Sequence, residues 1–152
     1  MWLWLKTALF SVFVPGMVAI FIPLQIANTK HYDPRSLVPG LVICAVGVCI
    51  YLWCAATFVR TGHGTPAPID EPTRFVAVGP YVWSRNPMYV GVLTAILGQA
   101  LIFLSWHIFV YAAVFFLIVE FFVRLYEEPH LRKKFGAEYE EYLRRTPRWI
   151  GK

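Results

Sequence analysis

Long apolar stretches alternate with short polar segments along the whole chain. The apolar stretches are Leu3–Ile26, Leu37–Val59, Met88–Leu104 and Trp106–Val123. A helix that crosses a bilayer needs roughly 20 apolar residues, with about 17 to 25 tolerated. The last stretch is interrupted only by Glu120, and the part of the chain from Asn86 to Val119 contains no Asp, Glu, Lys or Arg. As one helix this part would be about 50 Å long, against a hydrocarbon core of about 30 Å. It must therefore fold back, and the predicted tip is Ser105–His107.

This pattern predicts an all-α integral membrane protein with about four transmembrane helices, the last two of which form a hairpin. The composition agrees, because 58% of the 152 residues are hydrophobic and only 15% are charged. We expect one integral-membrane domain over 1–152, with two N-terminal spans in 1–60 and a loop, the hairpin and a tail in 61–149. The first stretch is too long for a signal peptide and contains Pro15 and Pro23, so it is interpreted as a retained span.

The charged tail is predicted to be an amphipathic helix on the cytosolic membrane surface. Four residues, Leu131, Phe135, Tyr139 and Tyr142, form an apolar stripe between charged positions. Eight Lys and Arg residues follow from Arg124 onward, and the formal net charge of the chain is +5. The positive-inside rule then places both termini in the cytoplasm, in a bacterial inner membrane or an endoplasmic-reticulum-type membrane. The basic charge indicates contact with anionic lipid, since no nucleic-acid-binding module is present.

The sharpest cluster of charge lies at the end of the last apolar stretch. Glu120, Arg124, Glu127 and Glu128 are spaced i, i+4, i+7 and i+8, which predicts one face of a helix. A carboxylate inside an apolar stretch costs a few kcal/mol unless it is paired or faces water. An ion pair between Glu120 and Arg124 would satisfy the first carboxylate without any function. The adjacent Glu127 and Glu128 need a further cation, which is either Arg85 or a cationic ligand.

The segment Gly79–Gly91 is the second candidate for chemistry. It contains a Gly-Pro turn, the aromatic residues Tyr81 and Trp83, the cation Arg85, and an Asn-Pro pair typical of a helix start. A cationic segment directly before a membrane-length apolar stretch indicates an anionic or zwitterionic ligand. The preceding loop, Thr61–Val78, is rich in glycine and proline, and we expect it to cover a site.

The order of motifs resembles one family. The pattern G-P-Y-x-x-x-R-N-P-x-Y-x-G, an uncharged hairpin, R-x-x-E-E-P-x-L, F-G-x-x-Y-x-x-Y and a closing P-R-W is similar to the isoprenylcysteine carboxyl methyltransferases, which are grouped with the membrane phospholipid methyltransferases. The resemblance covers about the C-terminal half. It implies that S-adenosyl-L-methionine binds near the cytosolic surface, and that a hydrophobic or lipid-tailed acceptor arrives through the bilayer.

The resemblance also implies the roles of individual residues. The cofactor contacts that it implies are Arg74, Phe75, Val76, Tyr81, Asn86, Pro87, Met88, Tyr89 and Glu128. We add Glu127, because carboxylates suit a cationic cofactor, and Arg85, because it is the cation of the segment that indicates an anionic or zwitterionic ligand. The resemblance places Arg124 on the substrate side. The family often has histidine where this chain has Asn86, which cannot titrate.

Three functions remain open, with Arg124 and Glu120 as the candidate catalytic residues. The first, which we favour, is methylation of an acceptor carboxylate that Arg124 orients. The second is methylation of an amine such as that of phosphatidylethanolamine, with Glu120 or Glu127 as the base. The third is a nicotinamide-dependent membrane reductase. A membrane protein without catalytic activity is the remaining alternative, and no metal is expected in any of them.

Overall fold

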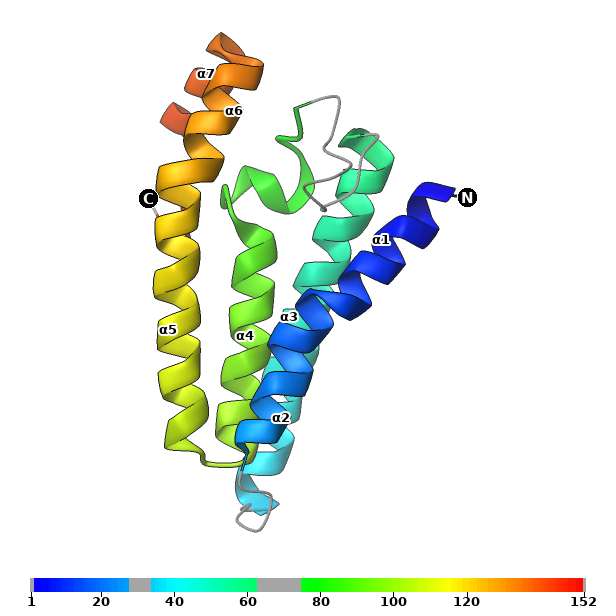
Figure 1. Ribbon diagram of the computed structural model, residues 1–152, viewed down its shortest axis with the longest axis vertical. Coiled ribbons are helices and arrows are strands. Elements are labelled where there is room, and N and C mark those ends of the chain that lie inside the picture. Colours follow the sequence, from blue (N-terminus) through cyan, green and yellow to red (C-terminus); the bar gives the residue numbers. More distant parts are fainter. Residues whose placement is uncertain (1, 28–33, 63–74, 152) are drawn as a thin grey trace.

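The computed structural model describes residues 2–27, 34–62 and 75–151, and within these ranges all regular structure is helical (Figure 1). The α-helices are α1 (Trp2–Phe13), α2 (Ile22–Ile26), α3 (Pro34–Thr57), α4 (Pro87–Ile102), α5 (Trp106–Phe122), α6 (Glu128–Phe135) and α7 (Ala137–Arg145). The π-helical turns are η1 (Met17–Phe21), η2 (Phe58–Gly62) and η4 (Val123–Glu127), and η3 (Gly79–Val82) is a short 3₁₀ helix.

The predicted all-α membrane fold is confirmed. Three continuous helices are long and apolar enough to cross a membrane, namely Trp2–Ile26, Pro34–Gly62 and Trp106–Phe135. The fourth predicted span, α4, has 16 residues, which is about 24 Å of helix and slightly short of a full span. The hairpin is present, and α4 lies between α3 and α5 (Figure 1). Its tip comes marginally earlier than predicted, because Ser105 is already the N-cap of α5.

Glycine residues bring the backbones of α3 and α4 into direct contact. A Cβ atom on Gly47 would lie 2.5 Å from the backbone nitrogen of Ala95, and one on Gly98 would lie 2.6 Å from that of Cys44. Both distances are shorter than any side chain tolerates. Small residues allow this close approach in membranes, where dispersion contacts hold helices together. The contact fixes α4, and with it the segment that leads into the helix.

Polar contacts attach the first span to the other helices. The side-chain amide of Gln99 donates to the backbone carbonyl of Ala19 in η1, and the Tyr111 hydroxyl donates to the carbonyl of Val18 at 2.9 Å. These carbonyls lie in a π-helical turn shortly after Pro15, a residue that has no backbone donor. Side chains from α4 and α5 thus satisfy backbone groups that the bilayer core cannot.

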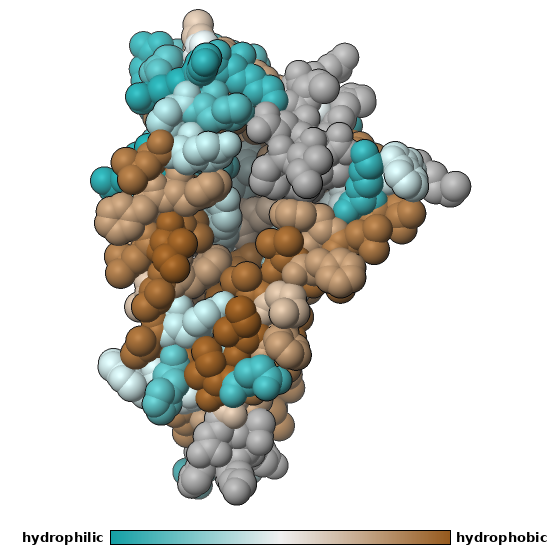
Figure 2. All heavy atoms as spheres, in the orientation of Figure 1, coloured by the Kyte–Doolittle hydropathy of each residue, from teal (hydrophilic) through white to brown (hydrophobic). Residues whose placement is uncertain are grey.

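The tail differs from the single amphipathic helix predicted. The helix continues through Pro129 and ends at Gly136, whose φ of 52° is a left-handed value that glycine tolerates best. A second helix, α7, then runs back. The aromatic stripe does not face lipid, because Tyr139 and Tyr142 are buried against Phe75, with ring centroids 5.7 and 5.0 Å apart. The charged faces of α6 and α7 form the hydrophilic end of the molecule, above the hydrophobic flanks of the long helices (Figure 2).

Candidate active site

The segment that leads into α4 forms one wall of the candidate site. Gly79 has a φ of 61°, which allows the turn into η3, and Pro87 begins α4 as predicted. Asn86 occupies the N-cap position, but its side chain does not cap the helix. Its amide instead donates to the backbone carbonyl of Arg148 at 3.0 Å, and Ser84 Oγ accepts the Asn86 backbone N–H at 3.1 Å. The segment is therefore held by the end of the tail.

Glu128 is the centre of a buried ion-pair network. Its Oε1 atom accepts from Arg85 Nη1 at 2.9 Å and from Arg148 Nε at 2.8 Å, and its Oε2 atom accepts from Arg148 Nη2 at 2.9 Å. Only 8% of the residue is exposed. The hydrogen bond to Glu128 raises the pKa of Arg148 above its usual value, so this guanidinium stays charged. The predicted partner Arg85 is confirmed, whereas Arg148 was not predicted.

Glu120 has the predicted ion pair with Arg124 and two further partners. The pair with Arg124 joins residues four positions apart on α5 and η4. Trp149 Nε1 donates to Glu120 Oε2 at 2.6 Å, and Arg148 Nη1 lies 3.6 Å from Glu120 Oε1. The Arg124 side chain is 57% exposed, although its partner carboxylate is only 15% exposed. More than half of the Arg124 side chain is therefore accessible to a further contact.

Glu127 differs from the other two carboxylates because no cation pairs with it in the described part of the chain. It accepts one hydrogen bond, from the Tyr89 hydroxyl of α4 at 3.2 Å. Glu127 closes the π-helical turn η4, which is wider than an α-helical turn and changes which residues face α4. The two adjacent carboxylates therefore have different environments. Two arginines neutralise Glu128, whereas Glu127 can still accept hydrogen bonds beside the ring of Tyr89.

An aromatic cluster supports the site from within the protein. Tyr81 is 6% exposed and packs with Cys54 and Val76, and its ring lies edge-on to Phe58 at 5.2 Å. Burial raises the pKa of Tyr81 well above its usual value, so the phenol stays neutral. Its backbone carbonyl accepts from the Tyr142 hydroxyl at 2.6 Å. Of the predicted aromatic contacts, Phe75 and Tyr81 therefore pack against other aromatic rings, whereas Tyr89 contacts Glu127.

Most of the predicted residues come together at this end of the bundle. One polar network, linked through Arg148, contains Arg85, Asn86, Glu120, Arg124 and Glu128. Tyr89 and Glu127 form a separate hydrogen-bonded pair next to it in the chain. Pro87 and Met88 begin α4 beside it, Phe75 packs against the tail helices, and Val76 and Tyr81 belong to the cluster around Cys54. Arg74 lies outside the described residues. The sequence reasoning missed Arg148 and Trp149, although the closing P-R-W motif that contains them was a usable signal.

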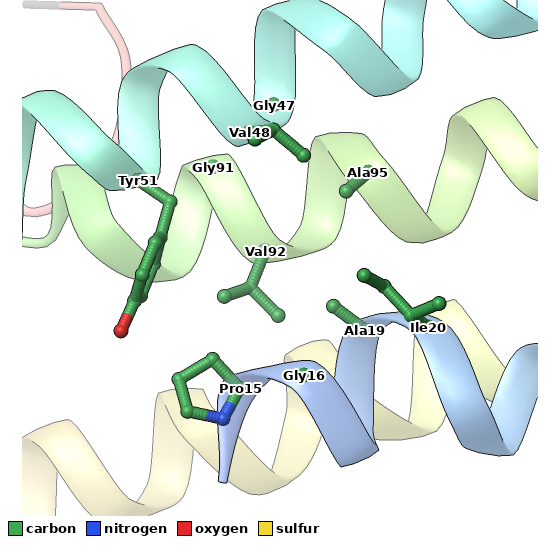
Figure 3. A pocket seen from close by; sticks show the side chains of 10 residues that line it. All are labelled: Pro15, Gly16, Ala19, Ile20, Gly47, Val48, Tyr51, Gly91, Val92 and Ala95. Atoms are coloured by element: carbon green, nitrogen blue, oxygen red, sulfur yellow. The ribbon is translucent and has the colours of Figure 1, made fainter. Parts of the chain in front are cut away.

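A cavity of about 110 Å³ lies apart from this network (Figure 3). It is lined by Pro15, Gly16, Ala19, Ile20, Gly47, Val48, Tyr51, Gly91, Val92 and Ala95. These residues come from the first span, α3 and α4, and none of them is a predicted site residue. The lining atoms that face the cavity are apolar, so it offers no partner for a charged ligand. It is suited to hydrocarbon, and the candidate active site remains the charged network.

The network can receive both a cation and an anion. Glu127 offers carboxylate oxygen to a cation, and the exposed guanidinium of Arg124 offers planar paired donors to a carboxylate or phosphate. Within 2–27, 34–62 and 75–151, no group of three or more His, Cys, Asp or Glu residues is placed to hold a metal ion. The charged side chains of the described residues offer ion pairing and charge-assisted hydrogen bonds to a ligand.

The fold and the network define a small helical membrane enzyme that holds its charged groups at one end of a hairpin. The model of the phospholipid methyltransferase family matches residues 36–138, which is more than half of the chain, and the chain belongs to this family. The protein is thus a membrane methyltransferase, of the superfamily that includes isoprenylcysteine carboxyl methyltransferases. No curated protein and no solved structure matched the chain in the comparisons. Arg148 and Trp149 lie beyond the matched range.

Proposed function

We propose that the protein transfers a methyl group from S-adenosyl-L-methionine to a carboxylate of a hydrophobic or lipid-modified acceptor, as a protein-S-isoprenylcysteine O-methyltransferase does. The observation that supports a carboxylate acceptor is the exposure of Arg124, whose side chain is 57% exposed next to the buried network. A half-exposed arginine at the surface of a bilayer suits an anionic group on a molecule held by that bilayer.

The residues present suit this methyl donor. The donor carries a cationic sulfonium and a cationic amine, and Glu127 is a carboxylate without a cation partner among the described residues. Arg85 Nε is buried and has no hydrogen-bond partner in that part of the chain, so it can meet an acceptor atom of the ligand. When bound, the donor supplies a methyl group: its C–S bond breaks as the acceptor oxygen forms the C–O bond, and the electron pair stays on sulfur.

The other predicted contacts complete the donor side of the proposal. Tyr89 orients Glu127 through its hydroxyl, and Glu128 holds Arg85 in place. The remaining members of the proposed donor site are Arg74, Phe75, Val76, Tyr81, Asn86, Pro87 and Met88. Tyr81 and Met88 belong to one packed cluster, which gives this side of the site a fixed shape. Positioning of this kind is the main contribution that an enzyme makes to a methyl transfer.

On the acceptor side, Arg124 orients the carboxylate and Glu120 holds Arg124. Arg124 pairs with Glu120 through its Nε atom, and 57% of its side chain is exposed, so the guanidinium is accessible to the acceptor. A carboxylate is ionised at neutral pH, and no general base is needed before it attacks the methyl group. The products are a methyl ester and a neutral thioether, and no proton is transferred.

We further propose that the domain is a single unit in which both termini are cytoplasmic. The start of α1, the segment η3 and the tail lie toward the same end of the bundle (Figure 1). The Lys and Arg residues of the tail lie at this end, and the positive-inside rule assigns it to the cytoplasm. A soluble methyl donor then enters from the cytosol, and the acceptor enters sideways from a bacterial inner membrane or an endoplasmic-reticulum-type membrane.

An amine acceptor such as phosphatidylethanolamine is the second candidate, and the description of the matched family favours it. An ammonium group must lose a proton before it can accept a methyl group, so this reaction needs a base. Glu120 is poorly suited as this base, because Arg124, Arg148 and Trp149 already contact it. Glu127 has no cation partner among the described residues and would be the base in this alternative. The membership in a methyltransferase family removes the nicotinamide-dependent reductase from consideration.

The substitutions Arg124→Lys and Glu120→Gln separate the two acceptors. For a carboxylate, Arg124→Lys should lower kcat about 10- to 100-fold because a point charge cannot replace a bidentate fork, while the dissociation constant of the donor stays unchanged. The rate should be flat above about pH 6. Arg144→Lys, at an exposed arginine of α7 that pairs with Glu141, is the matched control. Methylation of phosphatidylethanolamine alone, with a rate that rises with pH and depends on Glu120, would overturn the proposal.

A further inference from the structure

The end of the tail, Pro147–Trp149, crosses the candidate active site as a strap. The backbone N–H of Arg85 donates to the Pro147 carbonyl at 2.9 Å. The Arg148 carbonyl accepts from Ser84 Oγ at 3.2 Å and from the Asn86 amide at 3.0 Å. These bonds join the strap to the segment before α4 over more than sixty positions of sequence. Hydrogen bonds to its backbone therefore hold the strap in place, and this sets the direction in which its side chains point.

The side chains of Arg148 and Trp149 both reach Glu120. The Trp149 ring packs on Phe116 of α5, with centroids 5.2 Å apart, and its indole N–H donates to Glu120 Oε2. Arg148 approaches Glu120 Oε1, the same oxygen that pairs with Arg124. Each oxygen of the Glu120 carboxylate thus has a partner from the strap. Arg124, Arg148 and Trp149 together offset the negative charge of Glu120.

We propose that the strap determines acceptor specificity, because it offsets the charge of Glu120 and so leaves Arg124 available to an anionic acceptor. This inference rests on the proposed carboxylate methylation. A carboxylate that binds Arg124 comes close to Glu120, and two like charges in a partly buried site repel each other strongly. With Trp149 and Arg148 in place, Glu120 holds Arg124 without opposing the acceptor. Trp149 is a positioning residue in this account, since it acts through Glu120.

The substitution Trp149→Phe tests this role, because it removes the indole N–H and keeps an aromatic ring against Phe116. We expect the KM for a prenylcysteine carboxylate to rise about tenfold, which is the effect of one charge-assisted hydrogen bond. The kcat and the dissociation constant of S-adenosyl-L-methionine should not change. The matched control is Trp106→Phe, because Trp106 is an exposed tryptophan at the opposite end of α5.

A double-mutant cycle with Glu120→Gln distinguishes this role from a purely structural one. If Trp149 acts by offsetting the Glu120 charge, Trp149→Phe should raise KM in the wild-type background and have no effect beside Glu120→Gln. An equal rise in both backgrounds, or no rise in either, would overturn the inference. If Trp149→Phe does not yield folded protein, the KM of Trp149→Leu is compared in the same two backgrounds. The wild-type protein tests the underlying function separately, because failure to methylate the carboxylate would already be seen there.

Discussion

Replacing Glu127 and Glu128 one at a time by glutamine separates donor binding from structural support. The two residues are adjacent in sequence, and both substitutions remove one charge while keeping the side-chain shape. Glu128 accepts from two arginines, whereas Glu127 accepts only from the Tyr89 hydroxyl among the described residues. We therefore expect Glu127→Gln to weaken binding of S-adenosyl-L-methionine and Glu128→Gln to weaken the fold.

The expected magnitudes follow from these partners. A hydrogen bond to a charged group contributes about 1.5–3 kcal/mol, so Glu127→Gln should raise the dissociation constant of the donor about 10- to 150-fold. Removing one partner of a buried ion pair costs about 3–5 kcal/mol. For Glu128→Gln we expect a loss of about 3 kcal/mol in the free energy of unfolding, because glutamine still accepts a hydrogen bond and the Arg148 side chain is 25% exposed.

Two measurements on detergent-solubilised protein are needed. Isothermal titration with S-adenosyl-L-methionine gives the dissociation constant, and denaturant unfolding followed by tryptophan fluorescence gives the stability. Glu141→Gln is the control for loss of a surface carboxylate, since Glu141 pairs with the exposed arginines Arg144 and Arg145 of α7. A folded Glu127→Gln variant that binds the donor as tightly as the wild type would refute the assignment of Glu127. A Glu128→Gln variant of unchanged stability would refute the structural role of the network.

Two further predictions concern the fold and its orientation. Gly47→Ala should lower the free energy of unfolding by about 1–3 kcal/mol, because the added Cβ would lie 2.5 Å from a backbone nitrogen of α4. Cys49→Ala, on the exposed side of the same helix, should leave stability within about 0.5 kcal/mol of wild type. In a cysteine-free background in intact cells, Trp106→Cys should react with an impermeant thiol reagent and Ile150→Cys should not. Labelling of Ile150→Cys but not of Trp106→Cys would show that the orientation is opposite to the one proposed.

The elements that the sequence predicts well are those set by local physics. The length of the apolar stretches, against the thickness of a bilayer, is enough to predict the hairpin and the long helices. The pairing of Glu120 with Arg124 follows from the i, i+4 spacing on one helix. The Asn-Pro start of α4 was also correct in its position, because proline at N1 is compatible with a helix start on local grounds alone.

The elements that the sequence did not predict depend on contacts between distant segments. The π-helical turn η4 sends Glu127 toward Tyr89 and Glu128 toward Arg85, and an α-helical spacing cannot show this change. The strap brings Arg148 within reach of Glu128 across 20 positions, which no local pattern encodes. Pro129 follows η4, and the helix continues through it, so the tail bends at Gly136 instead.

The most direct test of the account is a methyl-transfer assay on the purified protein in liposomes. The liposomes contain phosphatidylethanolamine and a prenylcysteine with a free carboxylate, and the donor is S-adenosyl-L-methionine labelled in its methyl group. The account predicts that label enters the prenylcysteine as a base-labile methyl ester, and that Arg124→Lys reduces this transfer while leaving donor binding intact. Label found only on the amine of phosphatidylethanolamine, or on neither acceptor, would contradict it.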